Sequence, residues 1–526
     1  MAVKSRAVKT RSASRARSTA ATGRNRSRPK NSGSRYASPS RSTRSTGENA
    51  PITPPRVIRA RIWFVGLFML APLVWLWWSF AIHQTALPSE PVIASSKTRG
   101  RIMLRDGTVL AESYRPKRDK KSDPLPDLQR AYPQGRLAGH LIGFKGKDRG
   151  LSGLEIFEEA RLKAGQDVIL TIDPVSQAAA EAALERVRVK QQAQGASVVI
   201  LEVGTNRVLA MANAPSFNPA SIDLRRGLPS DIENLWQNRA TRRVFEPGST
   251  TKALIAAALI DSGKATPDST IYAPMSRRVG RHIINDVLPR RNKDGTKIDH
   301  PTLTQILRYS SNVGISTMAE KMGPQKTFNY LSHFGFGSRT ELNGAPGRAG
   351  VLRDWNDWKP VDFATATFGQ GISTTALGLA TAFSVLTNDG MLIPPKLIEG
   401  GPELEGKRVI SSTAATQTRA MLKTAVEEGI PWAATIKGYC IGGKTGTAQV
   451  SVNGRYSTDV YDALFAGFFP CDAPKVTMVV EVLGPKKQNH GSQVAAPAFR
   501  EIAEEVLAAW GIAPGKDGSK TGVKRK

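Results

Sequence analysis

The pattern of apolar and polar positions divides the chain into an N-terminal segment without a core, one long apolar run and two folded parts. Residues 1–61 hold almost no large apolar side chains, and residues 62–82 read IWFVGLFMLAPLVWLWWSFAI without a charge. A helix of this length spans about 30 Å of hydrocarbon, so we expect one transmembrane helix at 62–82. A signal peptide is the alternative, but its apolar core would have only about 7–15 residues, with a short basic region before it.

Residues 83–190 show a strand-like pattern that is rich in turns. The run GRIMLRDGTVLAES has two short apolar stretches around Asp106-Gly107, which predicts a hairpin. QDVILTID (166–173) predicts another strand, and the alanine-rich run at 174–194 predicts a helix. We therefore expect a small β-rich domain over this part of the chain.

Residues 191–512 show two strands, then many helices, then three strands and a last helix. The first two strands flank a turn at 204–206, and helical stretches cover roughly 249–425. The late strands read GYCIGGKTGTAQV, ALFAGFFP and KVTMVVEVL. We expect them to join the early pair in one mainly antiparallel, five-stranded sheet flanked by helices, with a helical subdomain as an insert. The expected fold class is therefore α/β in the broad α+β sense.

Charge changes the picture at the two ends of the chain. Sixteen of the 74 Lys/Arg residues and one of the 44 acids lie in residues 1–61, and the formal net charge of the chain is +30. A serine-rich basic segment cannot bury enough surface to fold, so we expect a disordered arm there and a disordered basic tail at 513–526.

A basic arm can bind nucleic acid, but this one has no fold to aim base contacts. Because arginines precede the apolar run, the positive-inside rule places the arm in the cytoplasm and the remainder of the chain outside.

The two cysteines, Cys440 and Cys471, are too few for a disulfide scaffold or for most zinc modules. One opens a late strand and the other closes the next, so the two lie opposite each other if the strands form a symmetric hairpin. The sequence favours two small buried residues. A disulfide is the alternative, because an outside compartment allows one although its geometry is demanding.

Three short motifs follow one another in the larger part: Ser249-x-x-Lys252, Ser310-x-Asn312 and Lys444-Thr445-Gly446. Each is weak alone, because the chain repeats the same patterns at Ser27/Lys30, Ser216/Asn218, Ser451/Asn453 and Lys520-Thr521-Gly522. Taken singly, the second motif would be a turn and the third an edge strand with a bulge. The copies lie in tails, in a proline-bracketed loop or in a polar turn, whereas the chosen set lies at a helix start, between helices and on a strand.

Ser249 and Lys252 carry the candidate chemistry. Positions i and i+3 share a helix face, so the two side chains can touch. A serine becomes a nucleophile when a base removes its proton, and Lys252 can be that base if burial and a second cation, Lys444, lower its pKa. The alternative is that Ser249 only caps the helix. The apolar neighbours of Lys252 indicate that the lysine is buried rather than solvated.

The three motifs resemble those of the penicilloyl serine transferases, that is, penicillin-binding proteins and serine β-lactamases. Further stretches are similar to class B penicillin-binding proteins, among them RGRIMLRDGTVLAES, YPQGRLAGHLIGF, NRATRRVFEPGSTTK and YSSNVGIS. YSSNVG and HLIGF look most like the cell-division branch. The resemblance covers roughly residues 97–510. It implies a penicillin-binding transpeptidase fold, with 83–190 as a short pedestal of the dimerisation type and 191–512 as the transpeptidase domain.

By this resemblance the chain is a serine-type peptidoglycan D,D-transpeptidase, which crosslinks stem peptides and binds penicillin. Ser249 would attack the penultimate D-Ala carbonyl and expel the last D-Ala, and Lys252 would take the serine proton. Ser310 would relay a proton toward the leaving amine, with Lys444 nearby. Asn312 would hold the substrate amide and orient Lys252.

The resemblance also assigns the residues around the third motif. The backbone N–H groups of Ser249 and Thr447 would form the oxyanion hole. The hydroxyls of Thr445 and Thr447, on either side of Gly446, would hold the terminal carboxylate of the substrate. The family uses no cofactor and no metal in this reaction, so neither is expected.

The implied partners are peptidoglycan stem peptides on lipid-linked or nascent glycan, β-lactams, a SEDS-type glycosyltransferase and other division membrane proteins. No nucleic acid is expected. The implied location is the inner (cytoplasmic) membrane, with one span, a cytoplasmic N-terminus and a periplasmic catalytic domain.

Two features depart from the family pattern. Only about 20 residues separate Ala111 from Tyr132-Pro133, where the family usually has a longer membrane-proximal module, and Arg243 stands where the family tends to have an aspartate. Two other functions stay open. One is a hydrolase, either a D,D-carboxypeptidase or a β-lactamase type, and the other is a non-catalytic division scaffold.

Overall fold

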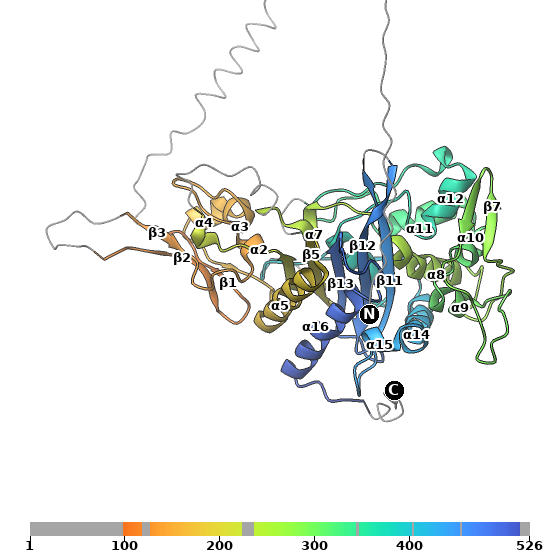
Figure 1. Ribbon diagram of the computed structural model, residues 1–526. Helices are drawn as coiled ribbons and strands as arrows, with labels where there is room; N and C mark the ends of the chain where they lie inside the picture. Colours follow the sequence, from red (N-terminus) through yellow and green to blue (C-terminus); the bar gives the residue numbers. More distant parts are fainter. Residues whose placement is uncertain are drawn as a thin grey trace, which may run out of the picture. The chain divides into compact units, whose positions relative to one another are not determined.

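The computed structural model describes residues 98–117, 127–222, 236–342, 347–401, 404–452 and 455–515 (Figure 1). The predicted transmembrane helix at 62–82, the predicted arm at 1–61 and residues 516–526 of the predicted tail lie outside these ranges. Among the helices of the described ranges, none is long and apolar enough to cross a membrane. All described residues belong to one unit, residues 94–526.

A five-stranded sheet forms the centre of the larger part of this unit. Its order is β11-β12-β13-β5-β6, and every neighbouring pair is antiparallel. The strands are β11 (Gly442–Val452), β12 (Arg455–Phe469), β13 (Val476–Leu483), β5 (Gly195–Glu202) and β6 (Val208–Ala214). Every position of β6 and β13 is buried, as their mainly apolar sequences favour. The prediction that the late strands join the early pair in one antiparallel sheet is confirmed.

Helices cover both faces of this sheet. On one face, α5 (Pro174–Gln191) contacts β5 and β6, α16 (Ala495–Ala509) contacts β12 and β13, and the two helices contact each other. A buried cluster that includes Phe465, Phe469 and Phe499 fills the space between them and the strands. On the other face, α13 (Ala376–Ser384), whose residues are all buried, contacts β5 and β13. The strands β5, β6 and β13 are therefore buried on both sides.

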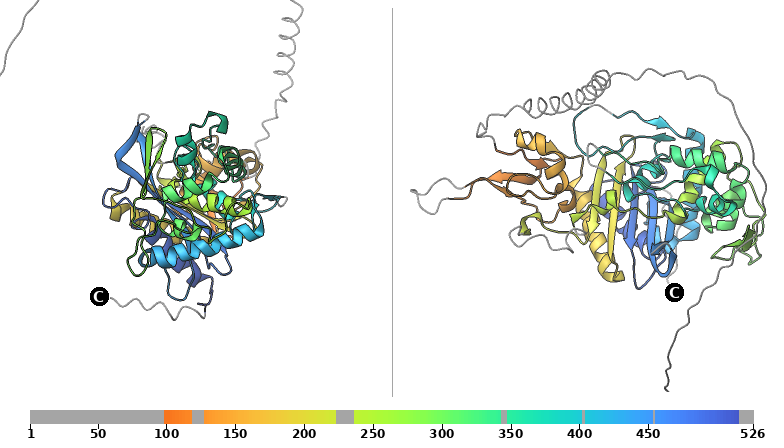
Figure 2. Two further views of the ribbon diagram at one scale, coloured as in Figure 1. Left: turned by 90° about the vertical axis from the view of Figure 1, so that its right-hand side faces the viewer. Right: turned by 90° about the horizontal axis from the view of Figure 1, so that it is seen from above.

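The helical subdomain lies beyond β11, at one end of the sheet (Figures 1 and 2). The small N-terminal domain, residues 98–169, lies at the other end, beyond β6. The helices of the helical subdomain are α8 (Thr251–Asp261), α9 (Leu303–Arg308), α10 (Asn312–Ala319), α11 (Pro324–His333), α12 (Pro360–Ala366) and α14 (Ser412–Gly429). The short helix α15 (Pro431–Ala434), which follows α14, contacts α16. Shorter helical turns are η1 (Pro219–Ser221), α7 (Arg239–Arg242), η3 (Gly248–Thr250) and η4 (Trp355–Asp357).

The prediction of helices throughout 249–425 is wrong in two places. One two-stranded sheet pairs β7 (Ser276–Val279) with β8 (His282–Asn285), and another pairs β9 (Met391–Leu392) with β10 (Lys407–Arg408). These strands have two to four residues, and most of their positions are not buried. Such short strands carry too little alternation of apolar and polar positions to be read from sequence.

The N-terminal elements form a small four-stranded sheet of order β3-β2-β1-β4 with short helices. They are β1 (Ile102–Met103), β2 (Val109–Tyr114), β3 (Gln129–Ala131), β4 (Val168–Ile169), α2 (Gly139–Ile142), α3 (Gly153–Phe157) and α4 (Glu159–Lys163). The predicted hairpin is confirmed, since β1 and β2 are antiparallel and Gly107 lies between them at φ 88°. The strand predicted at 166–173 is reduced to β4, which runs parallel to β1.

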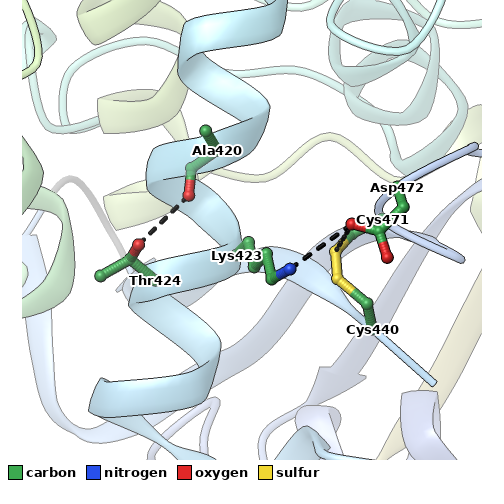
Figure 3. Close-up of a disulfide and its surroundings, with 6 residues drawn as sticks. All are labelled: Ala420, Lys423, Thr424, Cys440, Cys471 and Asp472. Carbon is green, nitrogen blue, oxygen red and sulfur yellow. Dashed lines mark hydrogen bonds and ion pairs between the residues drawn. A yellow bond between two sulfur atoms is a disulfide. The ribbon is translucent and has the colours of Figure 1, made fainter. Parts of the chain in front are cut away.

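A disulfide joins Cys440 and Cys471, whose Cα atoms are 5.1 Å apart (Figure 3). The prediction of two small buried residues is therefore wrong, and the alternative holds. Strand pairing explains this, because Gly442 lies opposite Phe468 and each cysteine lies two residues beyond the end of its paired strand. The Cys471 N–H also donates to the Cys440 carbonyl at 2.8 Å. The bond ties the start of β11 to the end of β12, beside α14.

Candidate active site

Ser249 lies in η3, the single 3-10 turn that leads into α8. Its side chain makes no capping hydrogen bond, so the reading of Ser249 as a helix cap is wrong. The preceding Gly248 has φ 53°, and a Cβ there would lie 3.2 Å from the carbonyl oxygen of Thr447. Glycine therefore permits both the left-handed backbone and the close approach of η3 to β11.

Lys252 is fully buried on the first turn of α8, as its apolar neighbours predict. Its Nζ lies 3.0 Å from Ser249 Oγ, 2.5 Å from the Ser310 carbonyl oxygen and 3.1 Å from Ser310 Oγ. All three oxygens are neutral. Burial first, and then the charge of Lys444, lower the pKa of Lys252 well below its usual value. A lower pKa favours the neutral amine, the form that can accept the proton of the adjacent serine.

Ser310 occupies the turn between α9 and α10 in the left-handed conformation, with φ 55°. This conformation costs a non-glycine residue roughly 1–3 kcal/mol, so the surrounding contacts must hold it. It turns the carbonyl of Ser310 toward Lys252, while Oγ lies between the two lysine amines, 3.1 Å from Lys252 Nζ and 3.0 Å from Lys444 Nζ. Ser310 therefore links the base to the second cation.

Lys444 comes from β11 and is 4% exposed. Besides Ser310, its Nζ contacts the carbonyl oxygen of Thr445 at 3.3 Å and the hydroxyl of Thr445 at 3.5 Å. Burial lowers the pKa of Lys444 to about 7. Near neutral pH this amine therefore exchanges a proton readily, which suits a group at the end of a proton relay.

Gly446 and Thr447 shape the β11 edge next to η3. A Cβ on Gly446 would lie 3.0 Å from both the Pro247 carbonyl oxygen and the Leu464 Cβ, so glycine allows close packing there. The hydroxyl of Thr447 accepts a hydrogen bond from the Gly491 N–H at 3.2 Å. Sequence reasoning missed Gly491, which belongs to the loop between β13 and α16 and carries no motif.

Asn312 is the first residue of α10, and its side-chain hydrogen bond goes to a residue other than Lys252. Its side-chain amide donates to the carbonyl oxygen of Asn285 at 3.0 Å. Lys252 is oriented by Ser310 instead. The predicted roles of Asn312, in orienting Lys252 and in holding a substrate amide, both stay predictions.

Arg243, which departs from the family pattern, belongs to a buried charge cluster. Its guanidinium donates to Asp462 at 2.7 Å and to Glu481, which in turn accepts from Ser197 at 2.6 Å. Burial raises the pKa of Glu481 and of Asp462. The cluster joins the segment before η3 to β12 and β13. Arg243 therefore has a structural role, in which it pairs with two buried carboxylates.

Comparisons with known proteins agree with this geometry. The model of the penicillin-binding protein transpeptidase domain matches residues 196–504, and that of the penicillin-binding protein A dimerisation domain matches residues 99–185. The probable peptidoglycan D,D-transpeptidase PenA of Neisseria meningitidis is 31% identical over 433 residues, 76% of this chain and 71% of PenA. The peptidoglycan D,D-transpeptidase FtsI of Escherichia coli K12 is 31% identical over 430 residues, 76% of this chain and 70% of FtsI.

A solved structure extends the comparison to the fold. Penicillin-binding protein 3 of Mycobacterium tuberculosis, complexed with aztreonam, matches with a TM-score of 0.72 and 29% sequence identity, over 80% of this chain and 97% of that one. The chain carries the family's three motifs on converging elements, with Ser249, Lys252, Ser310 and Lys444 in hydrogen-bond contact. It belongs to the penicillin-binding proteins of class B and is a serine-type peptidoglycan D,D-transpeptidase.

Proposed function

We propose that Ser249 forms the acyl-enzyme in crosslinking of peptidoglycan stem peptides, with release of D-Ala, during septal wall synthesis. The observation that carries this is the 3.0 Å contact between Ser249 Oγ and the fully buried Nζ of Lys252. A neutral amine at that distance removes the hydroxyl proton as the serine attacks the penultimate D-Ala carbonyl.

The remaining steps follow from the same contacts. The proton moves from Lys252 through the Ser310 hydroxyl to the departing amine of the last D-Ala, since Ser310 Oγ contacts both Lys252 and Lys444. Thr445 and Thr447 hold the terminal carboxylate at the β11 edge. The backbone N–H groups of Ser249 and Thr447 stabilise the oxyanion, for which the packing of η3 on β11 gives the proximity.

In the second half of the reaction, an amine from a neighbouring stem peptide attacks the acyl-enzyme and forms the crosslink. A hydrolase would instead need a base that activates water at the same carbonyl. Among the described residues, no carboxylate is hydrogen-bonded to Ser249, Lys252 or Ser310. Similarity to proteins named peptidoglycan D,D-transpeptidases supports transfer to an amine over hydrolysis.

Turnover of a fluorescent penicillin separates the two activities. We expect the purified full chain to keep the label through a chase with unlabelled penicillin, because water is a poor acceptor at this site. With stem-peptide substrate and an acceptor amine, mass spectrometry should show a crosslinked dimer and one released D-Ala per crosslink. Loss of the label within minutes, with D-Ala released and no dimer, would show a hydrolase instead.

The location and the partners are part of the proposal. The charge-free run at 62–82 and the arginines before it support a single-pass anchor with the catalytic domain outside the cytoplasm. Similarity to FtsI and the stretch YSSNVG support a place in cell division. The SEDS-type glycosyltransferase is proposed as a partner from the family resemblance alone. We expect a tagged full chain in the membrane fraction and at midcell, and a chain lacking residues 1–96 in the soluble fraction. A full chain that is soluble, or spread along the side wall, would count against this placement.

A further inference from the structure

A buried ion pair lies directly behind the second motif. Asp286 follows β8, and Arg290 comes four residues later; their side chains are 2% and 1% exposed and form a salt bridge. Arg290 also donates to the carbonyl oxygens of Ala273 and Ile298, so both charges are fixed within the fold. None of the three motifs contains either residue.

Both charged groups meet at Ser311, the middle residue of the motif. The Ser311 hydroxyl donates to Asp286 Oδ2 at 2.6 Å and accepts from Arg290 at 2.9 Å and from the Gly314 N–H at 2.8 Å. These contacts use the one donor and both acceptor sites of a hydroxyl. Ser311 therefore has a single orientation, in which it also caps α10.

The same ion pair holds the residues on either side of Ser311. Asp286 Oδ1 accepts from the Val313 N–H at 2.9 Å, which fixes the first turn of α10. The side chain of Asn312 donates to the carbonyl of Asn285, the residue before Asp286. On the other side of Ser311, Ser310 has the left-handed backbone, and its carbonyl lies 2.5 Å from Lys252 Nζ.

We propose that Asp286 and Arg290 are positioning residues for the reaction: through Ser311 they hold Ser310 in the conformation that presents its carbonyl and its hydroxyl to Lys252. A left-handed serine relaxes when its neighbour is released, because the conformation is unfavourable in itself. Relaxation removes the oxygen that orients the base and the hydroxyl that relays the proton. The inference rests on Ser249 acylation as proposed above.

The proposal predicts a change in pH dependence that loss of fold stability alone would not cause. The Ser310 carbonyl favours the charged form of Lys252, because an ammonium donates a stronger hydrogen bond than an amine. Among the described residues, the charged group that faces Lys252 is Lys444, which has the opposite effect. Without the carbonyl the pKa of Lys252 falls further. Acylation needs the neutral amine. In a plot of acylation rate against pH, the fall in rate on the acid side should therefore move to lower pH, while the maximal rate at higher pH decreases.

The test compares three variants of the full chain in detergent. Arg290→Met breaks the pair and leaves a buried carboxylate, so it can also destabilise the fold. The double variant Asp286→Leu/Arg290→Met leaves no uncompensated charge, and such replacements commonly recover stability. The matched control is Arg277→Met, because Arg277 contacts Thr317 and Glu320 near the C-terminal end of α10, whereas Asp286 and Arg290 hold its N-terminal end.

We expect acylation by a fluorescent penicillin to fall about 100-fold in both Arg290 variants and less than twofold in the control, since small misplacements near reacting groups have effects of this size. The double variant should regain the melting temperature but not the rate or the pH profile. If the double variant recovered the melting temperature, the acylation rate and the pH profile, the proposal would be overturned, and Asp286 and Arg290 would have a purely structural role.

Amide hydrogen exchange over residues 310–314 gives a readout that needs no reaction. We expect faster exchange there in Arg290→Met than in the unmodified chain and in the Arg277→Met control. Equal exchange would overturn the positioning role, whatever the outcome with penicillin. An unmodified chain that takes no label would instead overturn Ser249 acylation, so the two failures are distinguishable.

Discussion

Replacement of Ser249 with alanine should abolish covalent labelling of the chain by a fluorescent penicillin. The oxygen of this hydroxyl forms the covalent bond to the penicillin carbonyl carbon. A neighbouring residue cannot replace it, because no other nucleophile would lie at the same position. The loss should reach about 10⁶-fold in acylation rate, the size seen when a serine nucleophile is removed. Gel fluorescence of the denatured protein measures it directly, since only a covalent label survives.

The control for this variant is Ser216→Ala, which removes the serine of one of the repeated motif patterns. Ser216 Oγ donates to the carbonyl oxygen of Arg136 at 3.3 Å in an exposed contact, far in sequence from the three motifs. Labelling should stay at the level of the unmodified chain. A labelled Ser249→Ala protein would remove Ser249 from the proposed role. An unlabelled Ser216→Ala protein of normal melting temperature would show that the loss of label is not specific to Ser249.

Replacement of Lys252 with methionine should slow acylation by about 10²–10⁴-fold, the usual contribution of a positioned general base. Methionine fills a similar volume in the fully buried position, so the fold should persist. Stopped-flow measurement of the second-order rate with penicillin gives the effect. The buried lysine, with its pKa lowered by burial and by Lys444, is the group whose loss removes proton transfer.

Two further variants sharpen this result. Lys252→Arg keeps a cation that does not lose its proton at accessible pH, so it should be at least as slow as the methionine variant. Lys264→Met changes an exposed lysine shortly after α8 and should leave the rate unchanged. An Lys252→Met rate within twofold of the unmodified chain would show that another group accepts the serine proton.

The central sheet and the long helices were predictable because their patterns are strong. Mainly apolar runs at β13 and β6 indicate strands that are buried on both faces. The stretch around α8 is apolar on every side, which requires burial of Lys252. The short pairs β7–β8 and β9–β10 carry no such signal. Their formation depends on neighbours that are distant in sequence.

The disulfide and Asn312 show the same limit at single residues. Strand register brings Cys440 to Cys471, and register is set by pairing along the whole hairpin rather than by the two cysteines. Asn312 was assigned to Lys252 through the family resemblance, but in this structure its amide donates to Asn285 of the β7–β8 pair, an element the sequence did not reveal. The interactions of both residues therefore came from tertiary structure.

The sequence by itself determined the identity and order of the three motifs, their placement at a helix start, between helices and on a strand, and the burial of Lys252. Only the tertiary structure decided that Ser310, 58 residues after Lys252 and 134 before Lys444, contacts both amines. It also decided the left-handed backbone of Ser310 and the ion pair behind it. The physical reason is that desolvation, through-space charge and hydrogen-bond geometry depend on which distant segments pack together, and a local pattern encodes only the tendency of each segment to be buried.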